Sequence, residues 1–183
     1  TGGAKLVLLP DRGGKITADD LAAALKHQHG DVHHVKPTAL SLTQTGETGV
    51  VYRLDEIREI CAVAHDHGLK VHMDGARFAN AVATLDCSPA EMTWKAGVDV
   101  LSFGASKNGA IAAEAVVLFE PGLAEAFAYR RKRAGHLFSK MRFIAAQFEA
   151  YLDDDLWLKM ATHANACTGV LAAALSDLRG VTL

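Results

Sequence analysis

Two polar side chains that come shortly after short, largely apolar segments are the first candidates for chemistry. Asp74 follows segment 71–73 and precedes Gly75, which lets the backbone turn tightly. Lys107 follows segment 100–103 and stands among glycine, alanine and serine residues, which leave room for a ligand. Each signal is weak alone, because an aspartate here is more often a helix cap and most loop lysines are solvated. If both segments are parallel strands, however, Asp74 and Lys107 meet at the sheet edge where ligands bind.

A lysine and a carboxylate at one sheet edge form the pair that pyridoxal phosphate requires. The lysine amine forms a Schiff base with the aldehyde of this cofactor. The carboxylate keeps the pyridine nitrogen protonated, so that the ring accepts the electrons of a carbanion. The pair therefore predicts a pyridoxal-phosphate site in which Lys107 carries the cofactor and Asp74 is the partner of the ring nitrogen.

The apolar pattern predicts strands that alternate with helices along the first part of the chain. Strands are predicted at 6–9, 39–43, 70–73 and 98–103, and helices after Thr17, over 54–64 and after Ser88. Such alternation is typical of an α/β fold with a mostly parallel sheet covered on both faces, in three α/β/α layers.

One further strand is expected to run in the opposite direction. Segment 113–119 reads as a strand, but only about nine residues separate it from the preceding one, fewer than a parallel crossover needs. We therefore expect one antiparallel strand in the sheet. From Gly122 onward the pattern predicts helix almost throughout, with a break near 151–155.

The bulk composition excludes several classes of protein. The 183 residues are 50% hydrophobic and carry a formal net charge of −2, which argues against a nucleic-acid or membrane-surface role. No apolar run reaches the roughly 18 residues of a membrane span. The three cysteines, Cys61, Cys87 and Cys167, form no closely spaced pair, which predicts free thiols, no metal site and a reducing, cytoplasmic location.

Two motifs resemble those of the low-specificity L-threonine aldolases, including a branch active on phenylserine-like substrates. These are segment 72–77, with the sequence HMDGAR, and segment 103–109, FGASKNG, at the spacing found here. The similarity extends from about His33 to Lys132. The family consists of fold-type-I, aspartate-aminotransferase-like pyridoxal-phosphate enzymes. The resemblance implies cleavage of L-threonine or other β-hydroxy-α-amino acids to glycine and an aldehyde.

The resemblance also implies roles for individual residues. Lys107 would carry the cofactor, Asp74 would pair with the pyridine nitrogen, and Arg77 would donate a hydrogen bond near the phenolic oxygen of the ring. A histidine at the position that matches His33 lies close to the substrate hydroxyl in the family, where cleavage must remove a proton. The alternatives are that a one-residue shift of the alignment gives this role to His34, or that both are ordinary loop histidines.

Several family features extend beyond this chain. The segments that supply the cofactor phosphate site, a stacking histidine and a carboxylate-binding arginine have no counterpart here. We therefore expect residues 1–183 to be the cofactor-binding large-domain core of a longer chain, in a homo-oligomer with shared active sites. The alternatives are another fold-type-I enzyme, a β-eliminating lyase or an aminotransferase, and a non-catalytic subunit of the same fold. The intact set of Asp74, Arg77 and Lys107 argues against the last.

Overall fold

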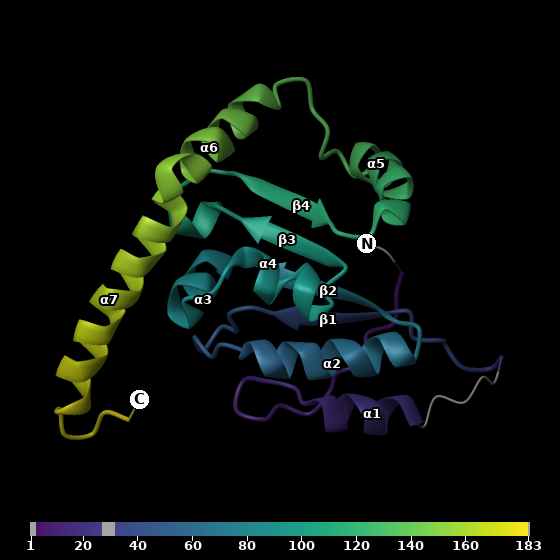
Figure 1. The fold of residues 1–183 in the computed structure, drawn as a ribbon, viewed down its shortest axis with the longest axis horizontal. Coiled ribbons are helices and arrows are strands. Elements are labelled where there is room, and N and C mark those ends of the chain that lie inside the picture. The colour runs from purple at the N-terminus through teal and green to yellow at the C-terminus, as the bar shows by residue number, and fades with distance from the viewer. Residues whose placement is uncertain (1–2, 27–31, 183) are drawn as a thin grey trace.

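The structure, a computed structural model, describes residues 3–26 and 32–182 (Figure 1). The strands are β1 (Ala39–Thr43), β2 (Lys70–Gly75), β3 (Val100–Gly104) and β4 (Glu114–Leu118). The helices are α1 (Ala18–Lys26), α2 (Leu54–Asp66), α3 (Phe78–Leu85), α4 (Pro89–Met92), α5 (Ala124–Arg133), α6 (Arg142–Leu152) and α7 (Leu156–Ser176). Along the described residues, no helix combines the length and the apolar character that a bilayer crossing requires.

The four strands form one sheet in the order β1-β2-β3-β4. β1, β2 and β3 are parallel, and β4 pairs with β3 in the antiparallel direction. This confirms the predicted mostly parallel sheet with one antiparallel strand. The register aligns Thr43 with Asp74 and Asp74 with Ser102, so the ends of the three parallel strands lie level with one another.

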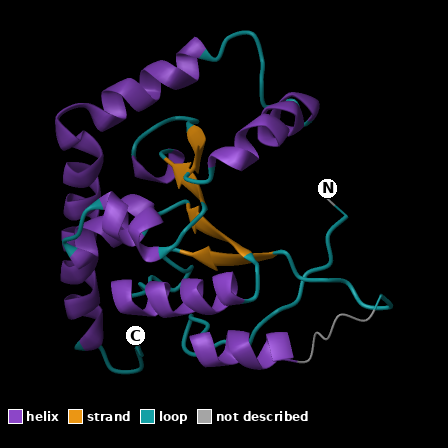
Figure 2. Ribbon diagram, turned by 45° about the vertical axis from the view of Figure 1, so that its right-hand side comes forward, coloured by secondary structure: helices purple, strands orange, loops and turns teal. Residues whose placement is uncertain are grey.

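Alternate residues of the strands build the core on one face of the sheet. Their buried side chains are Leu40, Leu42, Val71, Met73, Leu101 and Phe103. Helix α2 contributes Ile57, Ile60, Cys61 and Ala64, whose spacing matches one helical face. α1 lies against α2, and Figure 2 shows both on the same side of the sheet. Burial raises the pKa of the Cys61 thiol to about 12, as expected of a cysteine that serves packing only.

The C-terminal helices form a long arm at the end of the sheet where the parallel strands finish (Figure 1). α7 is held to α3 by two hydrogen bonds between Asn80 and Asn165: Asn80 Nδ2 donates to Asn165 Oδ1 at 2.9 Å, and Asn165 Nδ2 donates to the Asn80 carbonyl at 3.0 Å. At the start of α7, the Trp157 ring is nearly parallel to that of Phe78, with 6.5 Å between centroids. The arm is therefore anchored beside the sheet edge that carries the candidate site.

Two expectations about elements need correction. Segment 6–9 is not a strand, because no described strand pairs with it, and Leu6 and Leu8 are 83% and 90% exposed. A four-residue apolar run satisfies the strand pattern, but a strand also needs a backbone partner. The helical region after Gly122 has two breaks, whereas one was expected. The predicted break is present at Asp153–Asp155, and the second follows α5, where Gly135 has a φ of +79°.

Candidate active site

The structure brings Asp74 and Lys107 to the same edge of the sheet. Asp74 is near the end of β2, and Lys107 follows the end of β3 in the short 3₁₀ turn Ser106–Asn108. β2 and β3 are parallel neighbours, so Asp74, in the last part of β2, and Lys107, just after β3, lie at the same carboxyl edge of the sheet. This is the place where open α/β sheets bind ligands.

Asp74 keeps one carboxylate oxygen available. Its Oδ1 accepts a hydrogen bond of 3.0 Å from the Ala76 backbone N–H, whereas Oδ2 has no hydrogen-bond partner within residues 3–26 and 32–182. Helix α3 begins only at Phe78, so this bond closes the turn after β2 and does not cap the helix. At Gly75, a Cβ atom would lie 2.7 Å from the Ser102 carbonyl oxygen, so only glycine allows this close approach of β2 and β3.

Lys107 is exposed on a turn whose neighbours are fixed. The next residue, Asn108, is buried, and its Nδ2 donates to Tyr151 Oη at 2.7 Å and to the Trp157 carbonyl at 2.9 Å. On the other side, the Ser106 hydroxyl accepts a hydrogen bond from the Ala113 backbone N–H at 3.1 Å. The arm of α6 and α7 therefore holds the turn, while the lysine side chain itself reaches solvent.

A row of hydrogen bonds crosses the sheet next to Asp74. His72 Nδ1 lies 2.9 Å from Ser41 Oγ, and His72 Nε2 lies 2.8 Å from Ser102 Oγ, which joins β1, β2 and β3. Burial lowers the pKa of the His72 imidazole, and a neutral ring suits a row in which one nitrogen donates and the other accepts. Sequence reasoning missed this row, although His72 and Asp74 are two positions apart and share a sheet face.

A third strand end contributes Glu47, which sequence reasoning also missed. The loop after β1 presents Glu47 to Arg77, whose Nη1 and Nη2 each donate to a different Glu47 carboxylate oxygen at 3.2 Å. The Arg77 hydrogen bond, followed by the positive charges of Arg77 and Lys107, holds the pKa of the Glu47 carboxyl below its usual range. Glu47, Arg77 and Lys107 therefore form a charged group drawn from three consecutive strand ends. The only sequence signal was the position of this loop after a strand.

The other sequence candidates lie elsewhere. The segment that carries His33 and His34 leads into β1 and lies at the end of the sheet where the parallel strands begin (Figure 1). Helix α5, which carries Lys132 at the end of the segment that resembles the family, lies at that same end. Thr43 closes β1 and is aligned with Asp74 in the register of β1 and β2. Within one chain, the structure thus brings together Asp74, Arg77 and Lys107 at one end of the sheet, whereas the segment with His33 and His34 lies at the other end.

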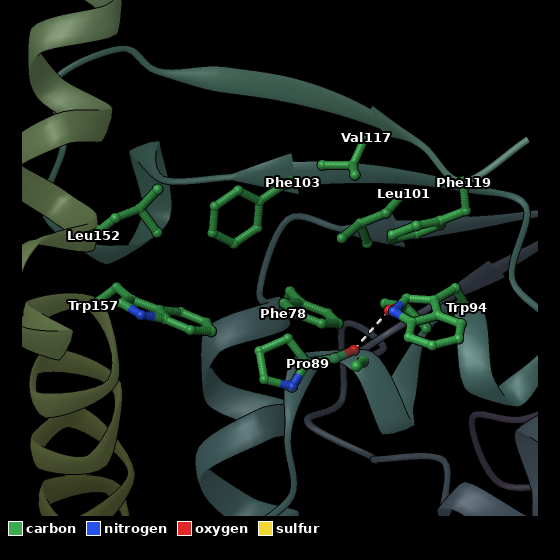
Figure 3. A pocket seen from close by; sticks show the side chains of 11 residues that line it. Phe78, Pro89, Trp94, Leu101, Phe103, Val117, Phe119, Leu152 and Trp157 are labelled. Atoms are coloured by element: carbon green, nitrogen blue, oxygen red, sulfur yellow. Dashed lines mark hydrogen bonds between the residues drawn. The ribbon is translucent and has the colours of Figure 1, made fainter. Parts of the chain in front are cut away.

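A cavity of about 360 Å³ opens on the helical side of the sheet (Figure 3). Its lining is almost wholly apolar and comprises Phe78, Pro89, Ala90, Thr93, Trp94, Leu101, Phe103, Val117, Phe119, Leu152 and Trp157. It has no charged group to bind a phosphate or a carboxylate, so it does not suit a phosphorylated cofactor. Among the described residues, no cluster of three or more histidine, cysteine or acidic side chains offers a metal site.

The residues at the sheet edge fit pyridoxal phosphate by their chemistry. Lys107 offers an accessible amine, Asp74 offers a carboxylate oxygen that is free to accept from a ring N–H, and Arg77 offers a guanidinium. The Ser102 hydroxyl is occupied by His72, so it is not available as a phosphate ligand while this bond is present. The fit thus rests on the three residues that the sequence motifs contain.

Comparison with known proteins shows which family this chain is similar to. Residues 1–183 match the family model described as beta-eliminating lyase. The chain is 52% identical to the low specificity L-threonine aldolase of Pseudomonas aeruginosa and 49% identical to that of Pseudomonas sp. strain NCIMB 10558; both alignments cover 99% of this chain and 52% of the relative. The Leishmania major threonine aldolase superposes with a TM-score of 0.86 at 30% identity, over 95% of this chain and 51% of that protein. This chain thus spans about half the length of its relatives.

Proposed function

Because this chain belongs to the beta-eliminating lyase family, we propose that the full-length protein is a pyridoxal-phosphate-dependent aldolase. Its substrates are L-threonine and related β-hydroxy-α-amino acids, such as phenylserine, and its products are glycine and an aldehyde. The observation that carries this proposal is the meeting of Asp74, Arg77 and Lys107 at one sheet edge in a chain 52% identical to a low specificity L-threonine aldolase.

Each of the three residues has a separate task in the proposed reaction. When bound, pyridoxal phosphate supplies an aldehyde for an amine and a ring that accepts the electrons of the cleaved Cα–Cβ bond. Lys107 holds the cofactor covalently through its amine. Asp74 keeps a proton on the ring nitrogen through its free carboxylate oxygen, and Arg77 donates to the phenolic oxygen.

The proposal also covers the cellular location and the oligomeric state of the enzyme. We propose a cytoplasmic homo-oligomer, because Cys61, Cys87 and Cys167 are all free thiols and because the segment with His33, the proposed proton acceptor, lies at the opposite end of the sheet from Lys107. A second copy of the chain would then complete each active site.

Product analysis of the full-length protein tests the reaction. We expect incubation of the cofactor-loaded protein with L-threonine to yield glycine and acetaldehyde in equal amounts, measured by chromatography and by an aldehyde-coupled assay. Ammonia with an oxo acid would instead identify a β-eliminating lyase, and amino-group exchange with an added oxo acid would identify an aminotransferase. Either of those results, or purified protein that takes up no pyridoxal phosphate, contradicts the aldolase proposal.

His33 is the proposed group that removes the proton from the substrate hydroxyl, with His34 as the alternative. The loop with His33 precedes β1, whereas Lys107 follows β3, so about 16 Å of strand separates the two ends of the sheet. A histidine at that distance serves this chemistry only in the site of a neighbouring subunit. The homo-oligomer and the role of His33 are therefore one linked proposal.

Mixed oligomers of two inactive variants test this link. We expect His33→Ala to lower kcat roughly a hundredfold, the lower end of the effect of general acid–base catalysis. Random mixing of His33→Ala with Lys107→Ala subunits should restore about a quarter of wild-type activity, since half of the dimers then carry one complete site. His34→Ala is the matched control and should retain activity. No recovery on mixing would exclude a site shared through His33.

A further inference from the structure

The strongest feature that the proposed mechanism leaves unused is Glu47. Its carboxylate binds Arg77 through two parallel hydrogen bonds of 3.2 Å, one to each terminal nitrogen of the guanidinium. The pairing joins residues thirty positions apart and links the loop after β1 to the turn after β2. This bidentate geometry fixes the plane of the guanidinium, which a single hydrogen bond does not.

The loop that presents Glu47 is itself well held. Gln44 is fully buried. Its side-chain amide nitrogen Nε2 donates to the Tyr52 carbonyl at 2.9 Å, and its Oε1 accepts from the Tyr52 backbone N–H at 3.0 Å. The Gln44 backbone N–H donates to the Asp74 carbonyl at 2.8 Å. The base of the Glu47 loop is therefore tied directly to the residue proposed to face the cofactor ring nitrogen.

The pair contributes little to the stability of the fold. The Glu47 side chain is 80% exposed and the Arg77 side chain 32% exposed, and ion pairs in such surroundings add little to folding because solvent screens them. The arrangement nevertheless limits where the guanidinium can lie. Glu47 occupies one edge of Arg77 and leaves its other N–H donors for a further partner.

We propose that Glu47 is a positioning residue of the active site, which holds the Arg77 guanidinium in the orientation that receives the cofactor beside Lys107. This inference rests on the proposed function, since it assumes that Arg77 contacts pyridoxal phosphate. Glu47 acts through Arg77 and touches neither the cofactor nor the substrate. Its loss therefore disturbs cofactor binding and the electronic environment of the ring before it disturbs the fold.

Cofactor titration of the full-length protein tests the proposal. Cofactor-free wild type and Glu47→Gln are titrated with pyridoxal phosphate, and binding is followed by the absorption of the bound cofactor. We expect Glu47→Gln to weaken binding about fivefold, the loss of one well-oriented pair, and to change the position of the absorption maximum. Glu47→Asp should recover part of both properties. The melting temperature of the cofactor-free protein should stay unchanged, which a purely structural role would not predict.

A second background and a matched control complete the experiment. In an Arg77→Lys protein, which cannot form the bidentate pair, Glu47→Gln should change the affinity less than about twofold, because coupled residues are not additive. Glu120→Gln removes an ion-paired glutamate at the other end of the sheet, where Glu120 Oε2 lies 2.9 Å from Lys70 Nζ, and should have no effect on binding. Equal weakening by Glu47→Gln in both backgrounds, or wild-type affinity and spectrum in Glu47→Gln, overturns the proposal. Failure of the wild type itself to bind the cofactor would instead refute the proposed function.

Discussion

Replacement of Lys107 by alanine in the full-length protein is expected to lower kcat for threonine cleavage by about three orders of magnitude or more. The amine of Lys107 is the proposed covalent attachment of the cofactor. The turn that carries it is fixed by the hydrogen bonds of Asn108 to Tyr151 and to the Trp157 carbonyl, so the backbone of the variant keeps its place. Nothing in this turn then substitutes for the missing amine.

The same variant separates chemistry from folding. Because the Lys107 side chain is exposed, its removal should change the free energy of unfolding by no more than about 0.5 kcal/mol. Borohydride reduction of the cofactor-loaded wild type, followed by peptide mass spectrometry, should find the cofactor on Lys107, and the variant should show no labelled peptide. Lys159→Ala, which removes a 58% exposed lysine from α7, is the matched control. A labelled lysine elsewhere, or turnover that survives in Lys107→Ala, would mean that the attachment site is wrong.

The meeting of Asp74 and Lys107 could be predicted from the sequence because it depends on chain direction. Strands that alternate with helices run parallel, so their carboxyl ends share one edge whatever the details of packing. The antiparallel β4 was likewise predictable, since the nine residues between Gly104 and Glu114 are too few for a parallel crossover. Both inferences use linker lengths and local periodicity, which a single sequence contains.

The remaining features depend on contacts that no local pattern records. Segment 6–9 has the residue types of a strand, but the sequence does not say whether a partner strand is present. Glu47 looks like any polar loop residue until the fold places Arg77, thirty positions later, opposite it. The end of the sheet at which the His33 loop lies could be predicted from the sequence. A loop that precedes a parallel strand lies at the opposite edge of the sheet from a loop that follows one. Motif matching alone ignores that direction.

Replacement of Asp74 by asparagine is expected to lower kcat about a thousandfold while the cofactor stays bound. Asparagine has nearly the same shape, and its Oδ1 can still accept the 3.0 Å hydrogen bond from the Ala76 backbone N–H. It has no negative charge, however, so it does not hold a proton on the ring nitrogen. Without the Asp74 charge, a bound cofactor would lose the partner that favours its protonated ring nitrogen, and kcat would fall for that reason. Steady-state kinetics with L-threonine, together with the absorption spectrum of the bound cofactor, measure the two effects.

A pair of variants distinguishes this role from a structural one. If Asp74 served only to close the turn after β2, Asp74→Asn would keep the bond to Ala76 and full activity, and only Asp74→Ala would be impaired. If Asp74 holds the proton, both variants lose activity alike, although Asp74→Asn keeps the wild-type melting temperature. Asp66→Asn, at the exposed end of α2, is the control for loss of one carboxylate charge. We expect both variants to lose activity. The turn after β2 uses only Oδ1 of Asp74, whereas Oδ2 has no hydrogen-bond partner among the described residues and is left for the cofactor ring.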